Sequence, residues 1–167
     1  VRIKTKNMES NEKVKAHLLS VWKEERKLFS KGRECMLFVT DKHLIFVTKT
    51  EAKPKWWKAA VERQLLTLMK DSNTMITHDG YNEKELLVDL ENDKNQEYSL
   101  DDIKDIGTEE KVWGTILTLK IKTEDKEKKI QLSIVRDWVT YPIKDPVKFL
   151  KVDWAPIVAY IKQRNAS

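Results

Sequence analysis

The sequence predicts an α+β fold in which an antiparallel β-sheet closes into a small barrel flanked by helices. The runs 35–40 and 43–48 are rich in β-branched and aromatic residues, and a short polar break separates them. The run 115–123 alternates apolar with polar residues, and the run 128–135 returns after a charged turn. Both pairs are typical of antiparallel hairpins. A chain of 167 residues is long enough to form one domain with a proper core.

The first helix is predicted over residues 11–30. Ser10 or Asn11 can cap its start, and Gly32 can stop it. Its apolar residues recur at helical spacing, as expected for an amphipathic helix that packs on the sheet. These residues are Val14, Leu18, Val21, Trp22 and Leu28.

Two further helices are predicted later in the chain. In segment 54–72 a proline stands early, where a helix tolerates it, and apolar residues follow at helical spacing. In segment 153–164 Asp153 provides an N-cap, and Trp154 begins an apolar stripe suited to docking. The pair Asp145-Pro146 predicts one more helix start.

Shorter runs bring the number of predicted strands to seven. The seven are 35–40, 43–49, 75–78, 86–91, 96–100, 115–123 and 128–135. No internal repeat or composition break marks a second domain. Residues 1–33 are therefore taken as a tail with an amphipathic helix. Residues 34–167 are taken as the barrel domain, with a helical insertion at 54–72 and a C-terminal helix at 153–164.

Residues 34–135 resemble the pleckstrin-homology-like superfamily, particularly its GRAM-type and prokaryotic members. The similar stretches are the strand pair Leu37–Thr48, the segment Tyr98–Ile106 and the hairpin 116–134. The resemblance implies a seven-stranded barrel with one end plugged by a C-terminal helix, here the helix that contains Trp154. It also implies a platform that binds lipids, peptides or proteins.

The sequence departs from the superfamily pattern in three respects. Segment 54–72 is an insertion after the second strand, and the helix at 11–30 precedes the barrel. The phosphoinositide-binding members carry several Lys and Arg residues around their first hairpin. The turn between 35–40 and 43–48 has only Lys42, beside Asp41. High-affinity recognition of inositol phosphates is therefore not predicted.

Composition and charge restrict the setting and the partners. The lone Cys35 cannot form an intrachain disulfide, and no apolar run approaches the roughly 18 residues that cross a bilayer. These features predict a cytoplasmic protein without a transmembrane segment. The net charge is +5, but residues 71–110 carry −10. This asymmetry indicates either a mixed-sign surface or the steering of a polyanion or a second copy, so the oligomeric state stays open.

No catalytic motif is present in the sequence. Its four glycines support neither a nucleophile elbow nor a phosphate-binding loop, and its three histidines lack metal-site spacing. The oxygen-rich run 89–95 imitates a calcium loop, but strand alternation explains it better, because Lys94 replaces the required glycine. The sequence therefore predicts a non-catalytic protein without a cofactor or metal.

The candidate binding residues lie in Lys53-Pro-Lys-Trp-Trp-Lys58, which pairs basic with aromatic side chains. Trp57 follows the apolar stripe of its helix, which leaves Lys53, Lys55, Trp56 and Lys58 for a protein partner or an anionic membrane surface. A second interpretation is that another loop simply buries Trp56.

Nucleic-acid binding is the alternative function. It would use the basic strand residues Lys120, Lys122, Lys128 and Lys129 together with the N-terminal helix. The absence of aromatic residues among those lysines disfavours it, because β-sheet readers of nucleic acids stack bases on such side chains.

Overall fold

The computed structural model describes residues 12–25, 32–48, 55–77, 94–138 and 146–165. Its β-strands are β1 (Val14–Glu25), β2 (Arg33–Thr40), β3 (His43–Val47), β4 (Gln96–Ser99), β5 (Ile103–Lys111), β6 (Gly114–Lys122), β7 (Glu127–Trp138) and β8 (Pro146–Phe149). Its helices are α1 (Lys55–Lys70), α3 (Ala155–Asn165) and the 3-10 turn η1 (Leu100–Asp102).

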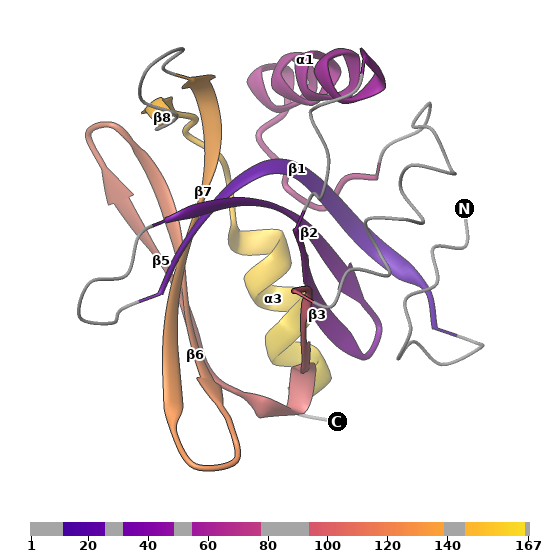
Figure 1. Ribbon diagram of the computed structural model, residues 1–167, viewed down its shortest axis with the longest axis vertical. Helices are drawn as coiled ribbons and strands as arrows, with labels where there is room; N and C mark the ends of the chain where they lie inside the picture. The colour runs from indigo at the N-terminus through magenta and orange to yellow at the C-terminus, as the bar shows by residue number, and fades with distance from the viewer. Residues whose placement is uncertain (1–11, 26–31, 49–54, 78–93, 139–145, 166–167) are drawn as a thin grey trace.

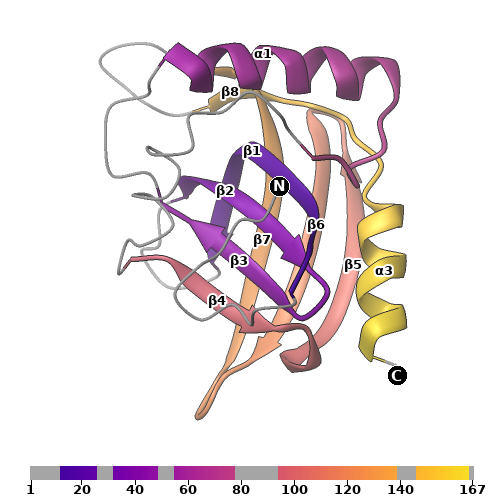
Figure 2. The same ribbon diagram turned by 90° about the vertical axis from the view of Figure 1, so that its right-hand side faces the viewer.

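The strands form one strongly curved antiparallel sheet (Figures 1 and 2). Seven of them follow the order β4-β3-β2-β1-β7-β6-β5, and β8 adds to β7. Within the described residues no pairing joins β4 to β5, so the predicted closed barrel is wrong. The short turn η1 leads the chain directly from one edge of the sheet to the other. Helix α3 packs beside β5 and η1 at this opening, where the Asn165 side chain donates to the Ile103 carbonyl at 2.9 Å.

The main core lies between the sheet and α3. Trp154, Ile157 and Ile161 from the C-terminal segment are buried against apolar residues of both halves of the sheet. Trp154 also donates from its indole nitrogen to the Thr115 carbonyl at 3.3 Å. The predicted C-terminal helix and its docking stripe are therefore confirmed.

The predicted N-terminal helix is wrong, because residues 14–25 form strand β1. A register shift against β2 lies between Leu18 and Val21, where Ser20 adopts a φ of 52°. This bulge places Ala16, Leu18 and Val21 in the same core, so apolar residues three apart share one face as they would in a helix. Leu19 packs in a second core on the other side of β1.

The two predicted hairpins and the helix at 54–72 are confirmed as β2–β3, β6–β7 and α1. Strand β1 also pairs with β2, so β2–β3 is the second hairpin of the sheet and β1–β2 is the first. The connection 26–31, with Arg26, Lys27 and Lys31 in its sequence, lies outside the described residues.

Other strand and helix assignments change. Residues 75–77 form no strand; the Ile76 carbonyl instead accepts a hydrogen bond from the His17 amide at 2.7 Å. The predicted strand 86–91 lies outside the described residues. The helix start at Asp145-Pro146 is wrong, because Pro146 begins β8 and pairs with Trp138. A proline at the first position of an edge strand sacrifices no essential ladder hydrogen bond.

Candidate functional site

Helix α1 carries three of the four sequence-predicted binding residues, and buried contacts fix it across one end of the sheet (Figures 1 and 2). Trp57 and Ala60 are buried in the second core with Leu19 and Met36. The buried Gln64 side chain holds the Leu19 backbone through two hydrogen bonds of 2.7 and 2.8 Å. Because this side of α1 is committed to the sheet, its opposite side is presented outward.

The outward side of α1 combines basic and apolar side chains. Leu66 and Met69 are 68% and 60% exposed, and their spacing of three residues places them side by side on the helix. Three or four residues separate neighbours on a helical face, so Arg63 and Lys70 lie next to Leu66. Both are exposed, as is Lys58 in the first half of the helix. The whole of α1 contains four basic residues and one acidic residue, Glu62.

The four candidate residues are described to different extents. Lys58 is exposed on α1, and Lys55 and Trp56 occupy the first turn of the same helix. The side chains of Lys55 and Trp56 are not among those described, and Lys53 lies outside the described residues. Trp57 is 3% exposed, which confirms its placement in the apolar stripe.

Sequence reasoning missed the second half of the outward face, Leu66, Met69 and Lys70. Helical spacing predicts that Met69 belongs to the buried stripe with Trp57 and Leu68, but Met69 is exposed and the buried side follows Trp57, Gln64 and Leu68. The sequence offers one signal for the orientation of α1, which is the position of Gln64. This polar residue interrupts the apolar pattern, yet its side chain is buried against the sheet.

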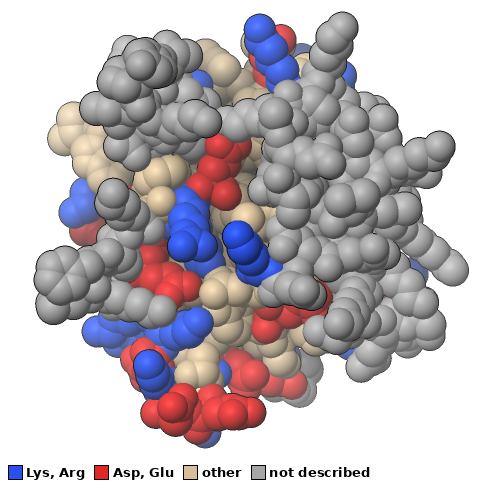
Figure 3. Space-filling model, viewed as in Figure 1, with Lys and Arg blue, Asp and Glu red and all other residues tan. Residues whose placement is uncertain are grey.

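Three of the four strand lysines considered for nucleic-acid binding share one side of the sheet, because Lys122 lies two residues from Lys120 on the same strand. Lys120 pairs directly with Lys129, so both lie on one side of the sheet. Lys128 pairs with the buried Ile121 and contacts Tyr98 on the other side, at 3.2 Å from the phenol oxygen. The described side chains on the face in Figure 3 mix basic with acidic groups rather than gathering one sign.

A buried lysine lies on the inner side of the sheet near this tyrosine. The Lys23 ammonium contacts the Gln96 side-chain oxygen, lies 3.4 Å from a Glu25 oxygen and sits 4.8 Å from the Phe46 ring centroid. Burial lowers the pKa of Lys23, while the Cys35 and Glu25 side chains act in the opposite direction. These contacts tie the partly buried Lys23 side chain to β3, β4 and its own strand.

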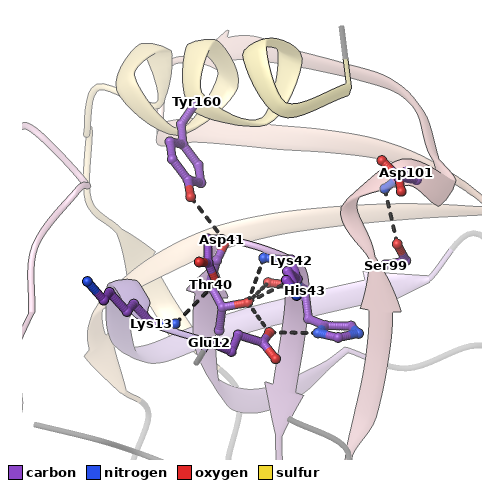
Figure 4. Close-up of polar contacts among 9 residues, drawn as sticks. All are labelled: Glu12, Lys13, Thr40, Asp41, Lys42, His43, Ser99, Asp101 and Tyr160. Carbon is purple, nitrogen blue, oxygen red and sulfur yellow. Dashed lines mark hydrogen bonds and ion pairs between the residues drawn. The ribbon is translucent and has the colours of Figure 1, made fainter. Parts of the chain in front are cut away.

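A carboxylate–histidine pair lies at the β2–β3 turn (Figure 4). The buried Glu12 carboxylate accepts from the Thr40 hydroxyl and lies 2.6 Å from the His43 Nδ1 atom. Thr40 also accepts from the His43 amide at 2.7 Å and from the Lys42 amide at 3.1 Å. The threonine thereby closes the turn, and Glu12 ties the chain before β1 to it. These contacts are those of a structural clamp.

A cavity of about 370 Å³ adjoins this turn and reaches η1 and the end of α3. Its charged lining mixes signs, with Lys42 and Arg164 among the basic residues and Asp41 and Asp101 among the acidic ones. Ser99 lies directly opposite His43 in the β3–β4 ladder, and its hydroxyl caps η1 by accepting from the Asp101 amide at 3.3 Å. The Ser99 oxygen is therefore engaged in holding the turn.

A second cavity of about 370 Å³ lies on the outer face of the sheet. Its walls include the aromatic side chains of Trp22, Trp113 and Phe149 and the carboxylates of Glu24 and Glu109. These residues come from three strands and one turn, so the sequence contains no compact motif for this groove, which we call the aromatic groove.

No described helix is long and apolar enough to cross a bilayer. No three described His, Cys, Asp or Glu side chains cluster as a metal site requires. In the comparisons with known proteins, no family model, no curated protein and no solved structure matches this chain.

Proposed function

We propose that the protein is a non-catalytic binding module that docks on anionic membrane surfaces through the outward face of α1. The observation that carries the proposal is the exposure of Leu66 and Met69 on a helix with four basic residues and one acidic residue. Amphipathic helices of this kind lie in the membrane interface, with their apolar side chains among the acyl chains and their basic ones at the headgroups.

The energetics favour an anionic over a neutral surface. Each Lys or Arg near an anionic leaflet contributes about 1 kcal/mol, and Lys58, Arg63 and Lys70 are each exposed on α1. Transfer of a large apolar side chain out of water contributes about 1.5–3 kcal/mol when it is fully buried. Neither contribution alone gives stable binding, so the proposal requires both kinds of residue.

A pleckstrin-homology-like identity is part of this proposal. The seven-strand antiparallel path and the C-terminal helix at its opening support it. The docking residues belong instead to the helix inserted after β3, so the binding mode is proposed for this chain from its own residues. The cytoplasmic leaflet, which is the anionic one, is the proposed target.

Co-sedimentation with phosphatidylcholine vesicles, with and without added phosphatidylserine, tests the function. We expect the protein to pellet with the anionic vesicles and to be released by salt, which screens the headgroup charge. The double variants Leu66→Ser/Met69→Ser and Lys58→Glu/Lys70→Glu should each weaken partitioning by about tenfold or more. The matched control is Val112→Ser, which removes an apolar side chain that is 97% exposed on the β5–β6 turn.

Equal recovery with neutral and anionic vesicles would refute an electrostatic membrane site. Wild-type partitioning of both α1 variants would place any membrane contact elsewhere on the molecule.

A further inference from the structure

The strand register builds the floor of the aromatic groove from four neighbouring strands. Trp22 of β1 pairs with Ser133 of β7, and Glu109 of β5 pairs with Ile116 of β6. The β6–β7 register, in which Leu117 pairs with Leu132, sets Ile116 beside Ser133. A single row of side chains therefore crosses the outer face of the sheet, from an indole at one end to a carboxylate at the other.

Two more aromatic side chains border this row at the end nearest the β5–β6 turn. Trp113 in that turn is 48% exposed, and its ring lies 5.1 Å from the ring of Phe149, centroid to centroid. The backbone holds Phe149 closely, because a Cβ atom at Gly114 would lie 2.8 Å from the Phe149 Cβ. The aromatic border is thus fixed on one side and open to solvent on the other.

The polar side chains that line the groove are those of Glu24, Glu109, Lys111, Gln131 and Ser133. Glu24 accepts a hydrogen bond from the Trp22 indole at 2.8 Å, and Glu109 forms a 2.6 Å ion pair with Lys111. The charged lining of two carboxylates and one ammonium has a net charge of −1. Lys111 itself shows that an ammonium group is accommodated beside Glu109.

We propose that the aromatic groove binds a lysine or arginine side chain of a protein partner. Indole faces attract cations through their quadrupole, and adjacent carboxylates add charge complementarity. A volume of about 370 Å³ lies at the lower end of ligand-sized pockets, which suits one side chain rather than a cofactor. The groove lies open on the sheet surface, so a partner chain can pass across it while one basic side chain enters.

This site is independent of the membrane face, because it uses β-strand and turn residues and attracts the opposite charge. The protein would then hold a basic segment of a partner while α1 rests on an anionic surface. Loss of either interaction leaves the other intact.

The test is a chemical-shift titration of the ¹⁵N-labelled full chain with the peptide acetyl-Gly-Gly-Lys-Gly-Gly-amide. We expect the indole N–H signals of Trp22 and Trp113 to shift saturably and the effect to weaken with salt. The same peptide with norleucine in place of lysine should cause no such shift, because it retains the alkyl chain without the charge.

Variants separate a groove site from general charge attraction. Trp113→Ala and Glu109→Gln should each weaken binding roughly two- to fivefold, the range expected for an exposed cation–π or ion-pair contact. Val112→Ala is the matched control in the same turn and should bind as the wild type does. Lys58→Glu/Lys70→Glu should also leave this binding unchanged.

Three results would overturn the proposal. The first is an equal shift with the norleucine peptide, and the second is no movement of either indole signal at the highest soluble peptide concentration. The third is wild-type affinity in both Trp113→Ala and Glu109→Gln.

Discussion

The side-chain amide of Gln64 pairs with the backbone of Leu19 in both directions. Its nitrogen donates to the Leu19 carbonyl at 2.7 Å, and its oxygen accepts from the Leu19 amide at 2.8 Å. Leu19 lies at the register shift of β1, between Leu18 and Val21. One glutamine therefore satisfies the backbone at the bulge and fixes the side of α1 that faces the sheet.

Replacement of this glutamine should destabilise the fold strongly. Gln64→Ala leaves a buried amide and a buried carbonyl of Leu19 without their partner, and each such group costs about 1–3 kcal/mol. We expect the free energy of unfolding in urea to fall by about 2–4 kcal/mol. The exposed Glu62→Ala in the same helix should change it by less than about 0.5 kcal/mol. Similar values for the two variants would show that the Gln64–Leu19 pairing does not anchor α1.

Two glycines of neighbouring strands should respond differently to alanine. A Cβ atom at Gly114 would lie 2.8 Å from the Phe149 Cβ, whereas at Gly107 the nearest atom is the Thr118 hydroxyl at 3.5 Å. Gly114→Ala must displace β8 or its aromatic ring, at a cost of about 1–3 kcal/mol. Gly107→Ala meets only ordinary contact and should be near neutral. Thermal unfolding of both variants measures the difference, and equal melting temperatures would contradict the close packing at Phe149.

Stability at alkaline pH should depend on Cys35. Burial raises the pKa of this thiol from 9.0 to about 12, with the nearby Lys23 acting in the opposite direction. Unfolding therefore releases a proton above the ordinary pKa. The thiol's contribution to stability is complete below pH 9.0 and is lost as the pH rises toward the folded value.

Unfolding in urea at two pH values checks this dependence. From about pH 8 to about pH 10 the wild type should lose about 1 kcal/mol more stability than Cys35→Val. The lowered pKa of Lys23 has the opposite effect on the pH dependence of stability, because the contribution of that group to the free energy of unfolding rises with pH. Because Cys35→Val also removes the effect of the thiol on the Lys23 pKa, the difference between the two proteins reports Cys35 together with its coupling to Lys23. Parallel pH profiles would contradict a thiol that stays protonated in the fold.

Helices α1 and α3 and the hairpin β6–β7 were predictable because each has one clear period of apolar residues, and the hairpin β2–β3 because its two apolar runs are rich in β-branched and aromatic residues. Strand β1 was not, for a specific physical reason. It is buried on both faces, and its bulge puts Leu18 and Val21 three residues apart in one core. A bulge has the same effect on the apolar pattern of β5, where a register shift lets Ile103 and Ile106 both face the core. A bulged strand thus imitates helical spacing in the sequence.

The candidate surfaces were likewise predictable from the sequence only in part. Lys58 and the burial of Trp57 follow from helical spacing alone. The exposure of Leu66 does not follow from helical spacing. It depends on which side of α1 faces the sheet, and the hydrogen bonds between Gln64 and the Leu19 backbone determine that side. The aromatic groove depends on the register of four strands, and nothing local in the sequence records how Trp22 and Glu109 are brought into one row.

The most direct test of the account is the position of Met69 when the protein meets a membrane. Because Cys35 is buried, a thiol-reactive, polarity-sensitive fluorophore can be attached selectively to Met69→Cys. With phosphatidylserine-containing vesicles we predict a blue shift of its emission and none for the same probe at Val112→Cys. Binding to the vesicles without a blue shift at residue 69, or with equal shifts at both positions, would contradict docking through α1.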